Sequence, residues 1–169
     1  MTILAIDPGT HLGWATWDGE RRDSGTWDNP WTHAKWPRSF FKAYKEWLGD
    51  MWRWHKPTEL WLAKTFSKST ATREVLLGIR SITLVWSLAH NMSCPQYLSE
   101  GTARKAVLGH GRPGKDKIVR MVQERFGWTG TSHDEADAIV ILEFAKLKGI
   151  EIENRHARIR VIYYKREDS

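Results

Sequence analysis

The sequence has a single cysteine, Cys94, among its 169 residues. One thiol excludes an internal disulfide framework and a zinc site built from cysteines. Long apolar runs are also missing, because no stretch approaches the roughly 18 residues that a membrane-spanning helix needs. The chain does not open with a basic segment followed by an apolar one, as a signal peptide would. These absences favour a cytosolic protein in a reducing compartment.

Basic residues and tryptophan are what the sequence has in excess. Lysine and arginine number 26 against 20 acidic residues, so the formal net charge is +6 and the isoelectric point is about 9.5. This balance favours a polyanionic partner, nucleic acid first, with a soluble basic protein as the alternative. Eleven residues are tryptophan. A chain of this length fits one domain with a hydrophobic core, and no repeat or linker divides it.

The stretch from Thr2 to Gly13 reads T-I-L-A-I-D-P-G-T-H-L-G. Its apolar run followed by a turn predicts a buried central strand that leads into a second strand. Asp7 then closes the first strand. A carboxylate is costly to bury there without a basic partner or a metal ion. The alternative is an aspartate that only caps the turn.

A second group of acids lies in S-H-D-E-A-D-A-I-V-I-L-E-F-A, residues 132–145. Apolar residues at helical spacing predict a helix over 133–148. Asp134 and Asp137 stand three apart, so they share one face of its first turn. The helix dipole explains acids at a helix start. It does not explain Asp137, which is flanked by alanines, faces the apolar side and needs a metal or a basic partner.

The motifs I-D-P-G-T-x-x-G-W-A and D-E-A-D-A, in this order, resemble the RuvC family of Holliday junction resolvases over roughly residues 2–148. The short, tryptophan-rich chain is more similar to phage-type relatives than to the housekeeping bacterial enzyme. The resemblance implies a ribonuclease H-like fold, an α/β five-stranded mixed sheet flanked by helices. It also implies a metal-dependent endonuclease for branched DNA, acting as a homodimer in a bacterial or phage-infected cell. Asp7, Asp134 and Asp137 match the family's acids, which would hold Mg²⁺, or Mn²⁺ in its place.

The family pattern has a further glutamate at the end of the fourth strand, and in P-T-E-L-W-L-A-K-T-F this position falls on Ala63. Glu59 lies four residues earlier, about 13 Å away along a strand, and Glu74 and Glu135 are substitutes outside the family position. The alanine is either an introduced replacement or a natural loss, and the otherwise intact motifs favour an introduced one. We therefore expect this chain to bind branched DNA but cleave it poorly, and Ala63→Glu to restore cleavage.

The remaining periodicities predict strands over 20–27, 59–63 and 96–98 and helices over 38–54, 73–90, 100–108 and 117–126. Loops are predicted over 28–37 and 64–72, and a basic C-terminal strand over 155–166 outside the family core. The aromatic stripe of the helix at 38–54 favours a core-facing role. A dimer face or base stacking is the alternative for these aromatics.

The glycine-rich basic loop G-H-G-R-P-G-K-D-K, residues 109–117, leads into a helix, an arrangement that commonly meets phosphate. It is not a Walker A motif, and basic residues of this region contact DNA in the resembled family. The predicted DNA-binding residues are all basic: Lys64, Lys68, Arg104, Lys105, Arg112, Lys115 and Lys117. Two other functions stay open, a non-catalytic module for branched nucleic acid and a ribonuclease H-like nuclease for other DNA or RNA structures.

Overall fold

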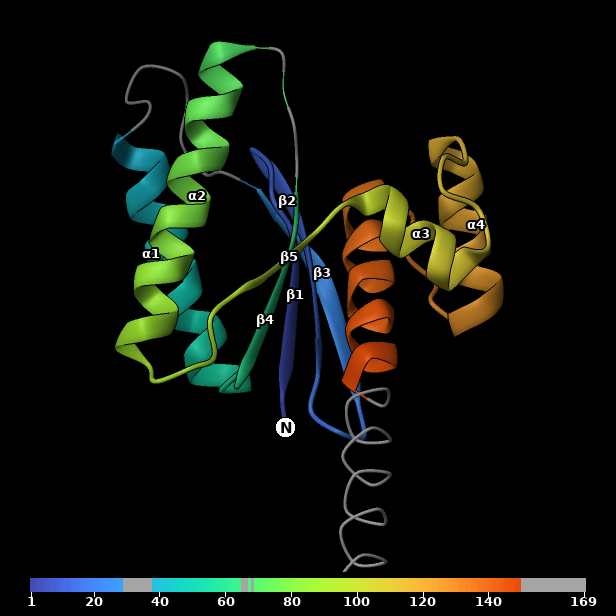
Figure 1. The fold of residues 1–169 in the computed structure, drawn as a ribbon, viewed down its shortest axis with the longest axis horizontal. Helices are drawn as coiled ribbons and strands as arrows, with labels where there is room; N and C mark the ends of the chain where they lie inside the picture. The colour runs from blue at the N-terminus through green and yellow to red at the C-terminus, as the bar shows by residue number, and fades with distance from the viewer. Residues whose placement is uncertain (29–37, 65–66, 68, 150–169) are drawn as a thin grey trace, which may run out of the picture.

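The computed structural model describes residues 1–28, 38–64, 67 and 69–149. Most of the predicted loop at 28–37, Lys68 and the predicted strand at 155–166 lie outside these described residues. The described chain forms three layers, with a sheet between two groups of helices (Figure 1). None of its helices combines the length and the apolar character that crossing a membrane would take.

Five strands form one mixed sheet in the order β3-β2-β1-β4-β5, which confirms the predicted architecture. The strands are β1 (Ile3–Asp7), β2 (His11–Trp17), β3 (Arg22–Asp28), β4 (Glu59–Ala63) and β5 (Gln96–Leu98). The first three strands pair antiparallel, whereas β4 runs parallel to β1 and β5 parallel to β4. The C-terminal ends of β1, β4 and β5 therefore meet at one edge of the sheet.

Helices cover both faces of the sheet. Helices α1 (Arg38–His55) and α2 (Thr70–Ala89) cover one face. Helices α3 (Glu100–Leu108) and α4 (Lys115–Phe126) cover the other, together with a C-terminal helix described over residues 133–149 (Figure 1). Helix α2 begins three residues before its predicted start because the Ser69 side chain accepts a hydrogen bond from the backbone N–H of Thr72 and caps the helix.

Alternation along the strands divides the apolar side chains between two cores. Toward α1 and α2, Leu4 and Ile6 of β1 pack with the aromatic stripe of α1, whose Phe40, Tyr44 and Trp47 are buried. The core-facing interpretation of this stripe is thus confirmed. Toward α3 and the C-terminal helix, the strands contribute aliphatic side chains, most of them alanine: Ile3, Ala5, Ala15, Ala63 and Leu98.

Candidate active site

Asp7 is the last residue of the central strand, and alternation puts its side chain on the same face as Ala5, toward α3 and the C-terminal helix. The residue is 9% exposed, and its Oδ1 atom has no hydrogen-bond partner within the described part of the chain. Burial raises the pKa of Asp7 well above its usual value, and the negative charges of Glu100, Asp137 and Asp134 raise it further. A buried acid with an open oxygen among other acids fits a cation site.

Asp134 and Asp137 lie in the first turn of the C-terminal helix, which comes down directly onto β2. Gly13 makes this approach possible. It pairs with Asp7 in the β1–β2 ladder, and a Cβ at position 13 would lie 1.8 Å from the carbonyl oxygen of Asp134. Asp137 is buried and Asp134 is half-buried. The three acids predicted to share a site are thus brought to one edge of the sheet.

Arg104, one of the predicted DNA-binding residues, is the main correction to the predicted surface, because the structure buries most of its side chain. The side chain is 17% exposed. Its Nε and Nη2 atoms donate hydrogen bonds to the two carboxylate oxygens of Asp137 at 2.9 and 2.7 Å. Nη2 also donates to Oε2 of Glu100 at 2.7 Å. Paired carboxylates draw the long side chain inward, since charge-assisted bonds of this kind are strong.

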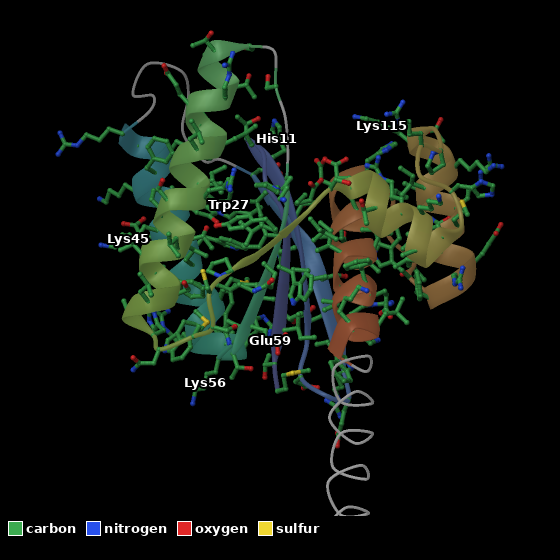
Figure 2. All side chains as sticks on the ribbon, viewed as in Figure 1. His11, Trp27, Lys45, Lys56, Glu59 and Lys115 are labelled. Carbon is green, nitrogen blue, oxygen red and sulfur yellow. The ribbon has the colours of Figure 1, made fainter. Side chains whose placement is uncertain are left out.

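Ala63 lies where the family pattern expects a glutamate. The parallel pairing of Ile6 with Leu62 puts it level with Asp7, and its side chain points to the same face. It is fully buried. Glu59 pairs with residue 3 at the opposite end of the sheet, far from the labelled Lys115 and His11 (Figure 2), so it is no substitute, as predicted.

The glutamate that does lie at the site is Glu100, which the sequence reasoning missed. It is the first residue of α3, directly after β5 and the helix-capping Ser99. The two substitutes considered lie elsewhere, since Glu135 accepts hydrogen bonds from a serine and a tryptophan side chain and Glu74 is exposed on α2. The sequence shows only that Glu100 follows a predicted strand directly. The structure adds that this strand lies beside β4, so that its C-terminal end shares the edge of the site.

The donor set at this edge consists of carboxylates, the ligands that hard divalent cations prefer. As the side chains stand, no group of three or more His, Cys, Asp or Glu residues in the described chain is close enough together to hold an ion. Arg104 lies between two of the carboxylates and supplies positive charge there. The open oxygen of Asp7 and the surplus of acids fit a divalent ion that draws these side chains together.

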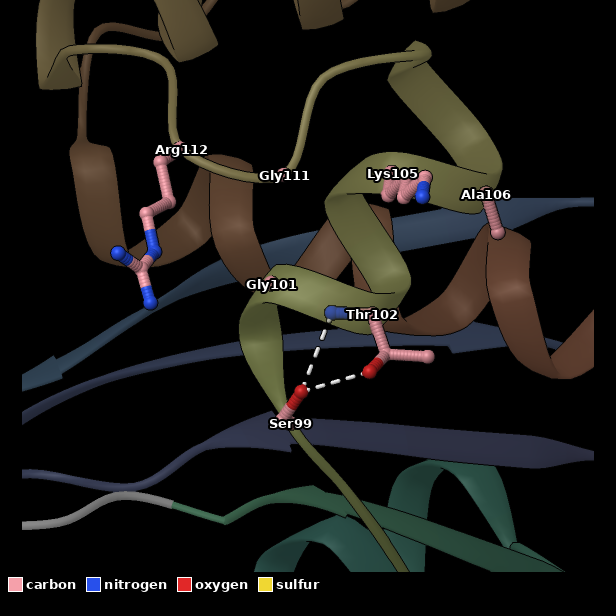
Figure 3. Close-up of a pocket in the computed structure, with 7 residues that line it drawn as sticks. All are labelled: Ser99, Gly101, Thr102, Lys105, Ala106, Gly111 and Arg112. Atoms are coloured by element: carbon pink, nitrogen blue, oxygen red, sulfur yellow. Dashed lines mark hydrogen bonds between the residues drawn. The ribbon is translucent and has the colours of Figure 1, made fainter.

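Basic side chains border the acids on the side of α3 and α4. Lys105 and Arg112 line a groove between α3 and the loop that follows it (Figure 3). Gly101 and Gly111 let this loop lie against the first turn of α3, because a Cβ at position 111 would lie 3.3 Å from the carbonyl oxygen of Gly101. The groove therefore offers two cations beside the acidic edge.

A second groove reaches one of the acids, Asp134. It is lined by the turn over residues 8–11, the start of α2, Lys115 and Asp134. Lys115 begins α4, two residues before the predicted helix start, so it and Lys117 lie on the first turn of a helix. Both are exposed, as are Lys64, Lys105 and Arg112.

No family model matches the sequence. The chain is 26% identical over 152 residues to the crossover junction endodeoxyribonuclease RuvC of Neisseria gonorrhoeae, covering 83% of this chain and 82% of that protein. A structure of Thermus thermophilus RuvC in complex with a Holliday junction substrate matches with a TM-score of 0.69 at 17% identity, over 83% of this chain and 90% of that one. The yeast mitochondrial Holliday junction resolvase matches with a TM-score of 0.53 at 15% identity, over 82% and 76%. These likenesses confirm the resemblance to the RuvC family predicted from the two acidic motifs, and the structural matches show that the chain has the fold of the RuvC structures.

Proposed function

We propose that the chain is a metal-dependent endonuclease that resolves Holliday junctions and related branched DNA by phosphodiester hydrolysis. One observation carries the proposal: Asp7, Asp134 and Asp137 converge at one edge of the sheet, and an oxygen of Asp7 has no partner among the described residues. The Neisseria relative is named a crossover junction endodeoxyribonuclease, and the Thermus protein was determined with a Holliday junction. Both names agree with this chemistry.

Asp7, Asp134 and Asp137 would hold Mg²⁺, for which Mn²⁺ can substitute. When bound at such a site, divalent ions make water nucleophilic near neutral pH and stabilise the leaving oxygen of a phosphodiester. The chain itself supplies rigidity, because Asp7 is fixed by the central strand and the helix acids by the contact with Gly13. Arg104 neutralises part of the acidic charge, which eases the approach of a phosphate.

With Ala63 in place we expect slow cleavage, but the chain should still cut a labelled four-way junction faster than a flap or an RNA–DNA hybrid, and only with a divalent ion present. The measurement is single-turnover cleavage of the three substrates in Mg²⁺, with a chelator as the control. Faster cleavage of the hybrid would instead favour a ribonuclease H-like nuclease for other substrates. Junction binding without cleavage, by both the chain and its Ala63→Glu variant, would favour a non-catalytic module.

The DNA-binding surface is proposed to run from the groove of Lys105 and Arg112 to the first turn of α4, with Lys64 beside it. Replacing both Lys115 and Lys117 with alanine should weaken binding to every DNA shape. Loss of two phosphate contacts should lower the slope of log affinity against log salt by roughly 0.9 for each contact. Filter binding across a salt series measures both effects.

A matched control removes the same charge elsewhere. Lys42 and Lys56 are exposed, and Lys56 lies at the opposite end of the sheet from Lys115 (Figure 2). Their double alanine variant should keep the wild-type salt slope. Equal slopes for the two double variants would exclude the first turn of α4 as a phosphate-contacting element.

We also propose that the chain acts as a homodimer through the outer face of α2. Leu77, Val85 and Leu88 lie on this face and are 53%, 66% and 63% exposed, whereas the aromatic stripe of α1 is buried in the core. A junction has two strands to cut, and a two-fold dimer presents two equivalent sites. Light scattering at micromolar protein tests this, and a monomer with and without DNA would refute it.

A further inference from the structure

We propose that Glu100 is a metal ligand of this site and takes the place of the glutamate that the family pattern expects at position 63. The inference rests on the proposed metal-dependent function and deepens it. The carboxylate concerned belongs to the first residue of α3. It would join Asp7, Asp134 and Asp137, so that the site keeps four carboxylates although β4 ends in an alanine.

The sheet brings Glu100 to this position. Ala63 pairs with Leu98 on the neighbouring strand β5, and the backbone N–H of Lys64 donates to the carbonyl of Leu98 at 2.6 Å, so pairing continues past the end of β4. Only Ser99 separates Leu98 from Glu100. Neighbouring strands lie about 4.8 Å apart, a distance that a glutamate side chain can span. The start of α3, directly after the strand next to β4, thus supplies the acid that β4 lacks.

Shared contacts show how close the acids are. Oxygens of Glu100 and Asp137 each lie 2.7 Å from the same nitrogen, Nη2 of Arg104, so they are no more than twice that distance apart. Two oxygens on opposite sides of one Mg²⁺ ion are about 4 Å apart. Small side-chain movements would bring this pair onto a common ion. Among the charges that raise the pKa of Asp7, that of Glu100 comes first, ahead of Asp137.

A simpler role for Glu100 would be to orient Arg104, since residues four apart on a helix often form an ion pair worth a few tenths of a kcal/mol. That role leaves Asp7 unexplained. Asp7 is 9% exposed and its Oδ1 has no partner among the described residues, although it lies among acids. The guanidinium marks the point between Glu100 and Asp137 where positive charge is favoured, and an ion would compete for the same oxygens.

The test is Mn²⁺ binding to the full chain, measured by isothermal titration calorimetry without DNA. E100Q keeps the size of the side chain and an oxygen that accepts from Arg104, so it should fold, which thermal melting checks. We expect E100Q to bind Mn²⁺ at least about tenfold more weakly than wild type, the scale reported for changes around metal sites. E124Q, which changes an exposed glutamate on α4, is the charge-matched control and should bind as wild type does.

The double variant A63E/E100Q should regain Mn²⁺ affinity, because it returns a carboxylate to the same face at the level of Asp7. Unchanged Mn²⁺ affinity in E100Q overturns the assignment. It is also overturned if the wild-type chain does not bind Mn²⁺ and only its Ala63→Glu variant does. Junction cleavage is read separately. A wild type that binds Mn²⁺ through Glu100 yet cuts no junction supports the ligand and refutes the endonuclease. Equal cleavage and equal Mn²⁺ binding by E100Q and wild type refute the ligand and support the endonuclease.

Discussion

The Asp7→Asn variant is expected to cleave junctions on the order of 10³-fold more slowly than wild type, the scale of single catalytic groups in other hydrolases. Asparagine keeps the size of the side chain but replaces an ionised oxygen with an amide nitrogen, so a divalent ion loses a ligand and a compensating charge. Single-turnover rates at saturating junction measure the loss. Asp50→Asn, on the distant helix α1, is the control and should cut as wild type does.

The same variant should be more stable than wild type in a chelator at neutral pH. Folding raises the pKa of Asp7, chiefly through burial, so the folded state loses stability relative to the unfolded state as the pH rises above the ordinary value of 3.8. This cost disappears as the pH falls toward the ordinary value of 3.8. The gain in Tm on substitution should therefore shrink between about pH 7 and pH 4.

Mn²⁺ should reverse the order of stability, because an ion that binds only the folded wild type stabilises it by mass action. Thermal melts in chelator and in Mn²⁺, at both pH values, give the complete comparison. If Asp7→Asn melts below wild type at neutral pH in chelator, the buried carboxylate does not destabilise the folded protein. The proposal of a cation site at the end of β1 would then be refuted.

Gly13→Ala is expected to be the most destabilising single-methyl change in the hairpin. The added Cβ would lie 1.8 Å from the backbone oxygen of Asp134, and no side-chain rotation moves a Cβ atom away from a backbone oxygen. Overpacking of a core typically costs about 1–3 kcal/mol, and this contact lies at the upper end. For a chain of this size, each kcal/mol lowers Tm by roughly 2–4 °C. Displacing Asp134 by about 1 Å would also cost roughly 10²-fold in cleavage rate.

Gly49→Ala is the matched control, because a Cβ there meets nothing within 4 Å and lies inside α1. This change should stabilise the protein by about 0.5–1 kcal/mol, since alanine is the better helix former. Differential scanning fluorimetry compares the two variants directly. A Gly13→Ala protein that melts with wild type would mean that the C-terminal helix does not lie on β2.

Much of the fold could be predicted where local signals mark both ends of an element. β4, β5 and α3 begin and end at the predicted residues, because a proline precedes each strand closely, Ser99 caps α3 and Gly109 ends it in a left-handed conformation. Strand β3 begins two residues after its predicted start, for a local reason that the periodicity of the sequence does not indicate. The Asp18 carboxylate accepts hydrogen bonds from two backbone N–H groups, which extends the turn before the strand.

The site was predictable to the extent that its acids end or begin elements with strong periodicity, as Asp7, Asp134 and Asp137 do. The roles of Glu100 and Arg104 could not be predicted, because they depend on how the elements pack in the tertiary structure. Their contribution depends on β5 lying beside β4 and on α3 packing next to the C-terminal helix, and sequence spacing does not encode strand order. The sequence offered no signal that Arg104 is buried, because its partner Asp137 lies 33 residues further on.

The contact between Gly13 and Asp134 joins segments from opposite ends of the described chain. During synthesis the β1–β2 hairpin emerges before the other strands, with Asp7 at the end of β1, but the acids of the C-terminal helix emerge only after all five strands of the described sheet. Domains fold as units once their segments are available. A nascent chain therefore carries an incomplete site until the C-terminal helix described here has emerged, and nuclease activity would arise only when that helix docks on the sheet. The contact that brings the acids together therefore also delays the formation of a complete site that could act on the cell's DNA.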